Sequence, residues 1–325
     1  MIKLGIIARS DYSGLAYQTL ALTKLLKPKK VLLIDSTPFN GREQHPDWFK
    51  NFTMTNGFAT DEEVKEFIKD LDVVLTCEVP YNDNLYKICR EVGVKTILQP
   101  NAELNPHILN RSLDLPDIFV LPSPWLEAET REIGIPTYVI KPPIIEPRAI
   151  QNIAKEKGKL RVLHFGGRRA AADRNGTEIV RALPKIEGIQ IDIHDQGANE
   201  VQDQRELYEQ GYHVILIPRR YGGLCLPMLE SLSYGLPVIM PNIEPNRQEL
   251  PQEWLTTAIR GPSIKTKHRI ETYNADQYGI VQTLERFRDM TQEEYEAERS
   301  KAFELTEAHK EQLEQWIRTI ESIVV

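Results

Sequence analysis

Short apolar runs that alternate with helical segments are the feature that most restricts how this chain can fold. In the first half, the runs KLGIIA, KKVLLID, DVVLTCE and VKTILQP are separated by segments of helical periodicity such as LAYQTLALTKLL and DEEVKEFIKD. In the second half, LRVLHFGG, IQIDIHD, YHVILIP and LPVIMP alternate with TEIVRALPKI, DQRELYEQG and PMLESLSYG. Strands that alternate with helices build parallel sheets with helices on both faces. The sequence therefore predicts an α/β protein with two parallel sheets.

The two series predict two Rossmann-like domains, and the length agrees because 325 residues exceed what one hydrophobic core usually supports. The boundary is expected in KPPIIEPRAIQNIAKEKGKL, where prolines and a charged stretch separate the series. We therefore expect a first domain over residues 1–150 and a second domain over residues 151–280. Charge-rich helices follow over residues 281–325, and we expect them to pack back across both domains.

Composition and charge narrow the class of protein. The net charge of −7 is spread evenly along the chain, which disfavours nucleic acid as a partner without excluding it. Cys77, Cys89 and Cys225 lack the spacing of metal ligands, so they predict reduced thiols and no metal site. No apolar run reaches the length of a membrane span, and the first residues do not form a signal peptide. We expect a cytoplasmic protein.

Two glycine- and arginine-containing segments follow strands of the second half. They are FGGRRAAADRNG and PRRYGGLCLPMLE. Ligands of open parallel sheets bind beyond the carboxyl ends of the strands, where both segments lie. Gly166 and Gly167 would allow close approach of the backbone, and three guanidinium groups suit a diphosphate, those of Arg168, Arg169 and Arg174.

The second of these segments continues into a short helix. Pro227 suits its first turn and Gly235 its end, so the Gly222-Gly223 turn would direct backbone N–H groups toward an anion. Glu230, one turn into the helix, can accept hydrogen bonds from a ribose diol. Taken alone, the Gly222-Gly223 segment could be a plain turn, and Glu230 could be a solvated surface residue. Together at one edge of a sheet, the two features favour a binding site.

The segment PRRYGGLCLPMLESLSYGLPVI resembles a motif of the retaining, family-four-like (glycosyl transferases group 1) enzymes with the GT-B fold. The family motif reads roughly Pro-Ser-x-x-Glu-Gly-Phe-Gly-Leu-Pro-x-x-Glu, with Gly-x-Pro-Val after it. HFGGRR…DRNG and DIFVLPSPWLEAETREIGIPTYVIKPPI are similar to further elements of that family. The resemblance implies two Rossmann-like domains that face each other across a cleft, with a nucleotide-diphosphate sugar held by the second.

The resemblance implies a donor site that contains Glu230 on the nucleotide ribose, with UDP- or GDP-linked sugars as the expected donors and no cofactor. The motif departs at Gly222, where the family has its first glutamate, eight residues before Glu230. The implied donor-binding residues are Gly167, Arg168, Arg169, Arg174, Tyr221, Gly222, Gly223, Leu224, Cys225 and Glu230.

The acceptor side rests on strand ends of the first half. LQPNAELNP places Asn101 and Glu103 after one strand, where Glu103 would position an acceptor hydroxyl or stabilise positive charge; a plain loop carboxylate is the alternative. Asp11, Gly14 and Glu78 lie at comparable strand ends and complete the expected acceptor-binding set.

The resemblance thus implies a glycosyltransferase of the hexosyltransferase type that acts with retention. Glu103, Arg168 and Arg174 are the expected catalytic residues, the arginines stabilising the departing diphosphate. Three alternatives stay open: a sugar-nucleotide-binding protein without transfer activity, a GT-B-fold sugar-nucleotide epimerase, and a glycosyltransferase that acts on modified nucleic-acid bases. The acceptor and the oligomeric state are not indicated.

Overall fold

The chain folds into two compact units. The computed structural model describes residues 2–101, 114–167, 173–195, 204–261 and 270–324. One unit comprises Met1–Ile145 with His309–Val325, and the other comprises Glu146–Ala308. The division after Ile145 falls five residues before the boundary expected at residue 150.

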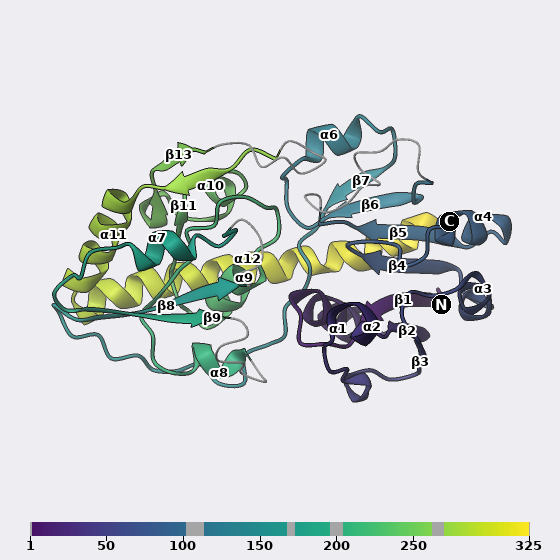
Figure 1. Cartoon of the computed structure of the whole chain (residues 1–325), viewed down its shortest axis with the longest axis horizontal. Coiled ribbons are helices and arrows are strands. Elements are labelled where there is room, and N and C mark those ends of the chain that lie inside the picture. Colours follow the sequence, from purple (N-terminus) through teal and green to yellow (C-terminus); the bar gives the residue numbers. More distant parts are fainter. Residues whose placement is uncertain (1, 102–113, 168–172, 196–203, 262–269, 325) are drawn as a thin grey trace. The chain divides into compact units, whose positions relative to one another are not determined.

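The first unit is built on a parallel sheet with the strand order β3-β2-β1-β4-β5-β6-β7 (Figure 1). The order reverses between β1 and β4, so the loops after these strands form the crevice in which open α/β sheets bind ligands. Its elements are β1 (Leu4–Arg9), α1 (Gly14–Leu26), β2 (Lys30–Ile34), α2 (Thr37–Asn40), η1 (Pro46–Trp48), β3 (Phe52–Thr55), α3 (Asp61–Ile68), β4 (Val73–Cys77), α4 (Leu85–Glu91), β5 (Lys95–Gln99), β6 (Ile118–Leu121), α6 (Glu127–Arg131) and β7 (Thr137–Val139).

The second unit has a smaller parallel sheet with the order β12-β11-β10-β8-β9. Its order reverses between β8 and β10, so the loops after these two strands lie at the ligand-binding edge. Its elements are β8 (Leu160–Gly167), α7 (Thr177–Arg181), β9 (Ile189–Asp195), α8 (Arg205–Tyr208), β10 (Val214–Leu216), α9 (Leu226–Ser233), β11 (Val238–Pro241), α10 (Asn246–Glu249), η3 (Gln252–Trp254), β12 (Leu255–Thr256), β13 (Ala258–Arg260), β14 (Tyr273–Ala275), α11 (Gln277–Asp289) and the start of α12 (Gln292–Val324).

Local sequence accounts for the main helix starts. The Ser13 hydroxyl caps α1 by accepting from the Ala16 N–H, and Thr60 and Glu63 form a capping box at the start of α3. Strands β1, β2 and β4 are buried on both faces, as their continuous aliphatic runs predict. Among the described residues, no helix is both long and apolar enough to cross a membrane.

The end of α12 belongs to the core of the first unit. The Trp316 side chain is fully buried, its indole Nε1 donates to the Lys141 carbonyl oxygen at 3.0 Å, and Ile320 packs into the same core. About two helical turns earlier, the His309 Nε2 lies 2.9 Å from the Pro142 carbonyl oxygen. Two side chains of the last helix therefore bond to the backbone of one short segment of the first unit.

His309 should make stability depend on pH. Burial lowers the pKa of His309 to about 4, below the value of about 6.5 in an unfolded chain. The neutral ring thus stabilises the fold fully above pH 6.5, and this contribution is lost as the pH falls. Between pH 7.5 and 5.5 we expect His309 to account for a loss of about 1 kcal/mol, which His309→Gln should abolish. Urea unfolding at both pH values measures this, and an equal loss in the variant would contradict it.

Candidate functional site

The two glycine- and arginine-containing loops of the second unit meet at the point where its strand order reverses. The Arg220 N–H donates to the Arg174 carbonyl oxygen at 2.8 Å. Gly176 has a φ of +72°, and a Cβ there would overlap the Pro218 carbonyl oxygen. The backbones of the two loops therefore lie against each other, and glycine is required where they touch.

Gly222 is surrounded by two guanidinium groups. Its φ is +117°, and a Cβ at this position would overlap Nη2 of Arg219 and lie 2.5 Å from Nη2 of Arg174. A side chain here would be strained by the backbone conformation and would have to displace the ends of both arginine side chains. The first glutamate of the family motif could therefore not replace Gly222 without a rearrangement of this loop.

Arg219 was not among the residues expected from the sequence. It is 6% exposed, and its guanidinium donates to the carbonyl oxygens of Tyr221, at 2.9 Å, and Leu224. Arg219 thereby fixes the loop between β10 and α9 from its inner side. In the sequence, Arg219 could be noticed only as an arginine shortly after a predicted strand and three residues before a Gly-Gly pair. The contacts of its guanidinium form only in the folded loop.

Glu230 is half-buried and held by a buried tyrosine. The Tyr208 hydroxyl donates to Glu230 Oε2 at 2.7 Å. The Tyr208 ring is 1% exposed and lies between Phe165 and Tyr234, with ring centroids 5.3 Å and 5.1 Å away. Burial, followed by the Glu230 charge, raises the pKa of Tyr208, so it remains a hydrogen-bond donor. Tyr208 is a positioning residue that the sequence did not indicate.

The other donor-side residues have different surroundings. A Cβ on Gly166 would overlap Oδ1 of Asp195, so this glycine makes room for a side chain of β9 rather than for a ligand. Gly167 ends β8 and pairs with Asp195. Burial raises the pKa of the Cys225 thiol to about 12. The structure places Tyr221, Gly223 and Leu224 in the loop that Arg219 holds, and Arg174 lies 5.5 Å from the Tyr221 ring centroid. Arg168 and Arg169 lie outside the described residues.

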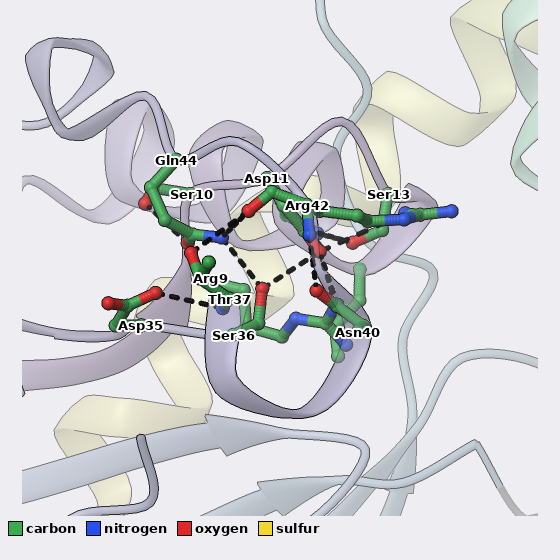
Figure 2. A network of polar contacts seen from close by, with 12 residues as sticks. Arg9, Ser10, Asp11, Ser13, Asp35, Ser36, Thr37, Asn40, Arg42 and Gln44 are labelled. Atoms are coloured by element: carbon green, nitrogen blue, oxygen red, sulfur yellow. Dashed lines mark hydrogen bonds and ion pairs between the residues drawn. The ribbon is translucent and has the colours of Figure 1, made fainter. Parts of the chain in front are cut away.

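Asp11, expected on the acceptor side, is the centre of a polar network (Figure 2). Its carboxylate is fully buried, and hydrogen bonds or ion pairs join it to Arg9, Ser13, Ser36, Asn40 and Arg42. Burial opposes the charged form, but the Ser13 hydrogen bond and the Arg9 charge outweigh it and lower the pKa of Asp11. Its oxygens are engaged by protein donors, which favours a role in organising the loops after β1 and β2.

The remaining acceptor-side expectations fall on the same sheet edge. Gly14 opens α1 and is exposed, and Glu78 follows β4 with a φ of +68°. Asn101 follows β5, and its Oδ1 is buried without a hydrogen-bond partner among the described residues. Glu103 lies outside the described part of the chain. Within that part, no group of three or more His, Cys, Asp or Glu side chains is arranged to hold a metal ion.

Solved structures resemble the whole chain. No protein-family model and no curated protein matches the sequence. The lipopolysaccharide outer core galactosyltransferase WaaB superposes with a TM-score of 0.65 at 13% identity over 99% of both chains. HepE of Anabaena, in complex with UDP and glucose, gives a TM-score of 0.66 at 11% identity over 99% of this chain and all of HepE. The chain has the GT-B fold.

The GT-B fold fixes the architecture of this chain but not its chemistry. Sucrose-phosphate synthase of Thermosynechococcus elongatus also matches, with a TM-score of 0.62 at 12% identity over 99% of this chain and all of the synthase. Identities this low establish only the fold, and one fold hosts many reactions. Function must therefore be argued from the GT-B site itself, with Glu230, Arg174 and the Gly222 turn at one sheet edge.

Proposed function

We propose that the protein is a glycosyltransferase that moves a sugar from a nucleotide-diphosphate sugar to an acceptor hydroxyl. The observation that carries the proposal is the Glu230 carboxylate, held by Tyr208 on the short helix that follows the Gly222 loop. A fixed, half-buried carboxylate beside the strand-order reversal is suited to accept hydrogen bonds from a ribose diol. UDP or GDP is the expected nucleotide, and the reaction is expected to need no cofactor.

The neighbouring groups suit the departing diphosphate. Arg174 and Arg219 bring two guanidinium groups next to the Gly222 backbone, and forked donors match phosphate oxygens. We assign Arg174, with Arg168, to stabilisation of the developing charge, and Glu103 to the acceptor side. The Gly167, Arg169 and Tyr221–Cys225 positions complete the proposed donor site. We further propose a hexosyl group, retention at the anomeric carbon and a cytoplasmic location, the last supported by three free, buried cysteines.

One observation favours a second candidate, a sugar-nucleotide-binding protein without transfer. The arginine tips around Gly222 fill the position from which the glutamate of the resembled motif would extend. Nucleotide release separates the two candidates. Slow production of free UDP or GDP from one sugar nucleotide supports the transferase, whereas tight binding with no release supports the binder. An isomerised sugar nucleotide formed without acceptor would instead identify an epimerase.

Arg174→Ala should weaken binding of free UDP or GDP about tenfold, since it removes charge-assisted hydrogen bonds from a half-buried site. A thermal-shift panel of UDP-, GDP-, ADP- and TDP-sugars first selects the nucleotide, because a ligand of the folded state raises the melting temperature. Calorimetry then measures the variant. Arg247→Ala is the matched control, since Arg247 is an exposed arginine of the same unit that pairs with Glu244. Equal nucleotide affinity in both variants would remove Arg174 from the donor site.

A further inference from the structure

A second pocket lies within the first unit, beside the point where its strand order reverses. It has a volume of about 500 Å³ and lies between the loops after β3 and β4. Phe58, Val79 and Tyr81 supply apolar walls, and Asn82, Asp83 and Asn84 supply a polar rim. The two loops are tied together, because the Asn82 Nδ2 donates to the Ala59 carbonyl oxygen at 2.8 Å and to Asp61 Oδ1 at 3.0 Å. The pocket is thus a built feature of the sheet edge.

Aromatic rings gather at this pocket and remain exposed. The side chains of Phe58 and Phe39 are 57% and 45% exposed. They stack on each other with centroids 4.9 Å apart and an interplanar angle of 11°, and the Phe58 centroid lies 6.2 Å from that of Tyr81. The packing of the fold leaves these faces open, and clustered exposed aromatic rings at a concave site mark a binding surface.

Buried polar atoms at the same place are unsatisfied. The Tyr81 side chain is 4% exposed, and its hydroxyl has no hydrogen-bond partner among the described residues; the same holds for Arg9 Nε. Burial raises the pKa of Tyr81, and Glu78, Arg9 and Asp11 are close enough to influence it. More than nine in ten buried polar groups in native proteins are paired, with protein, water or ligand. The Tyr81 hydroxyl is itself covered by protein, so Tyr81 gives the pocket a ring wall rather than a hydrogen-bonding group.

The backbone is strained at the same loop. Glu78 and Tyr81 have φ values of +68° and +61°, a conformation that favours glycine and is unfavourable for both side chains. Residues held in sparsely populated conformations cluster at ligand-binding positions. Here the strain places the Tyr81 ring against Phe58, with the ring as one wall of the pocket.

We propose that this pocket binds a neutral saccharide ring, and that this ring is the acceptor. A pyranose has an apolar C–H face that packs on aromatic rings and hydroxyl groups that donate and accept hydrogen bonds. The Phe58 ring suits the face, and the Asp83 and Asn84 side chains suit the hydroxyls. Asp83 lines the pocket, and the carboxylates of Glu78 and Asp11 outnumber the cation Arg9 near Tyr81, so the local charge disfavours a phosphorylated or carboxylated ligand. The role of this ring as the acceptor rests on the proposed function, whereas binding of a saccharide in the pocket does not.

Saturation-transfer NMR and titration with the methyl glycosides of glucose, galactose, mannose and N-acetylglucosamine test the proposal. At least one should bind, and Phe58→Ala should weaken it about tenfold by removing the stacking face. Phe52→Ala is the matched control, since Phe52 is a 41% exposed ring on β3 outside the pocket, and it should bind as wild type does.

The saccharide proposal would be refuted if no glycoside bound at tens of millimolar, or if the Phe58→Ala and Phe52→Ala proteins bound a glycoside equally well. It would also be refuted if oligothymidylate, a single-stranded nucleic acid, bound through Phe58 while the glycosides did not. Nucleotide binding is measured on the same samples to keep the two proposals apart. Saccharide binding lost in Phe58→Ala, in a protein that binds no sugar nucleotide, would refute the proposed function and leave the pocket standing. Sugar-nucleotide binding without saccharide binding would refute only the proposal that this pocket binds a saccharide.

Discussion

Alanine in place of Glu230 is expected to weaken binding of the sugar nucleotide by roughly ten- to a hundredfold, equivalent to about 1.5–3 kcal/mol for hydrogen bonds to a charged group. The carboxylate is oriented by the Tyr208 hydroxyl and rises from α9, so its loss removes acceptors for the ribose and leaves the loop in place. Calorimetry with the nucleotide selected by thermal shift measures the change. The fold should survive, because Glu230 is only half-buried and contributes no apolar packing.

Two variants sharpen this test. Tyr208→Phe keeps the ring between Phe165 and Tyr234 but removes the hydrogen bond to Glu230, so it should reduce affinity less than Glu230→Ala. Glu244→Ala removes an exposed carboxylate that pairs with Arg247 and should not change affinity. A folded Glu230→Ala protein that binds its nucleotide as tightly as the Glu244→Ala protein would refute the proposed donor site.

Trp316→Ala should destabilise the first unit by about 3–5 kcal/mol, the range for removing a fully buried aromatic side chain from a core. The indole packs in the core that β1, β2, β4 and β5 build, and its loss also leaves the Lys141 carbonyl oxygen without this donor. Unfolding in urea, followed by fluorescence and by circular dichroism, reports the change. Coincident shifts of both signals toward lower urea are expected.

Ile317→Ala is the control for the Trp316 variant, because Ile317 is the next residue of α12 and is 45% exposed. It should change the free energy of unfolding by less than about 1 kcal/mol. If the two variants unfold at the same urea concentration, the end of α12 does not stabilise the first unit.

Sequence periodicity was sufficient for the strands at the centre of each sheet. The apolar run at residues 160–167 coincides with the inner strand β8, because strands covered by helices read as continuous apolar segments. The strand at residues 189–195 was also predicted, although β9 is a half-exposed edge strand whose apolar and polar residues alternate. The strand β3 (Phe52–Thr55) was missed, since it is a four-residue edge strand with two exposed residues and has no clear pattern. Likewise, charge-rich helices were expected over residues 281–325, but the bond from Trp316 to the Lys141 carbonyl oxygen was not.

The candidate site shows the same division between local and long-range information. Glycines that follow strands and Glu230 on the next helix were visible because they belong to one continuous segment. Tyr208 and Arg219 were not, because their importance depends on contacts made only after β10 and the loops around it have folded. Gly166 was expected to leave space for a ligand, whereas Asp195 of the neighbouring strand fills that space. Spacing identified the edge of the sheet, and the side-chain partners required the structure.

The arginines around Gly222 limit the order in which mutations at this loop can accumulate. A glutamate introduced there alone would meet both Nη2 groups and a φ of +117°, and is expected to be harmful. The same glutamate introduced after Arg219 has been shortened would meet less crowding, but the loop would then lack its bonds to Tyr221 and Leu224. The effect of a change at residue 222 thus depends on which residue stands at 219. Variant libraries at this loop should therefore vary the two codons together, because libraries that vary residue 222 by itself would sample mainly strained loops.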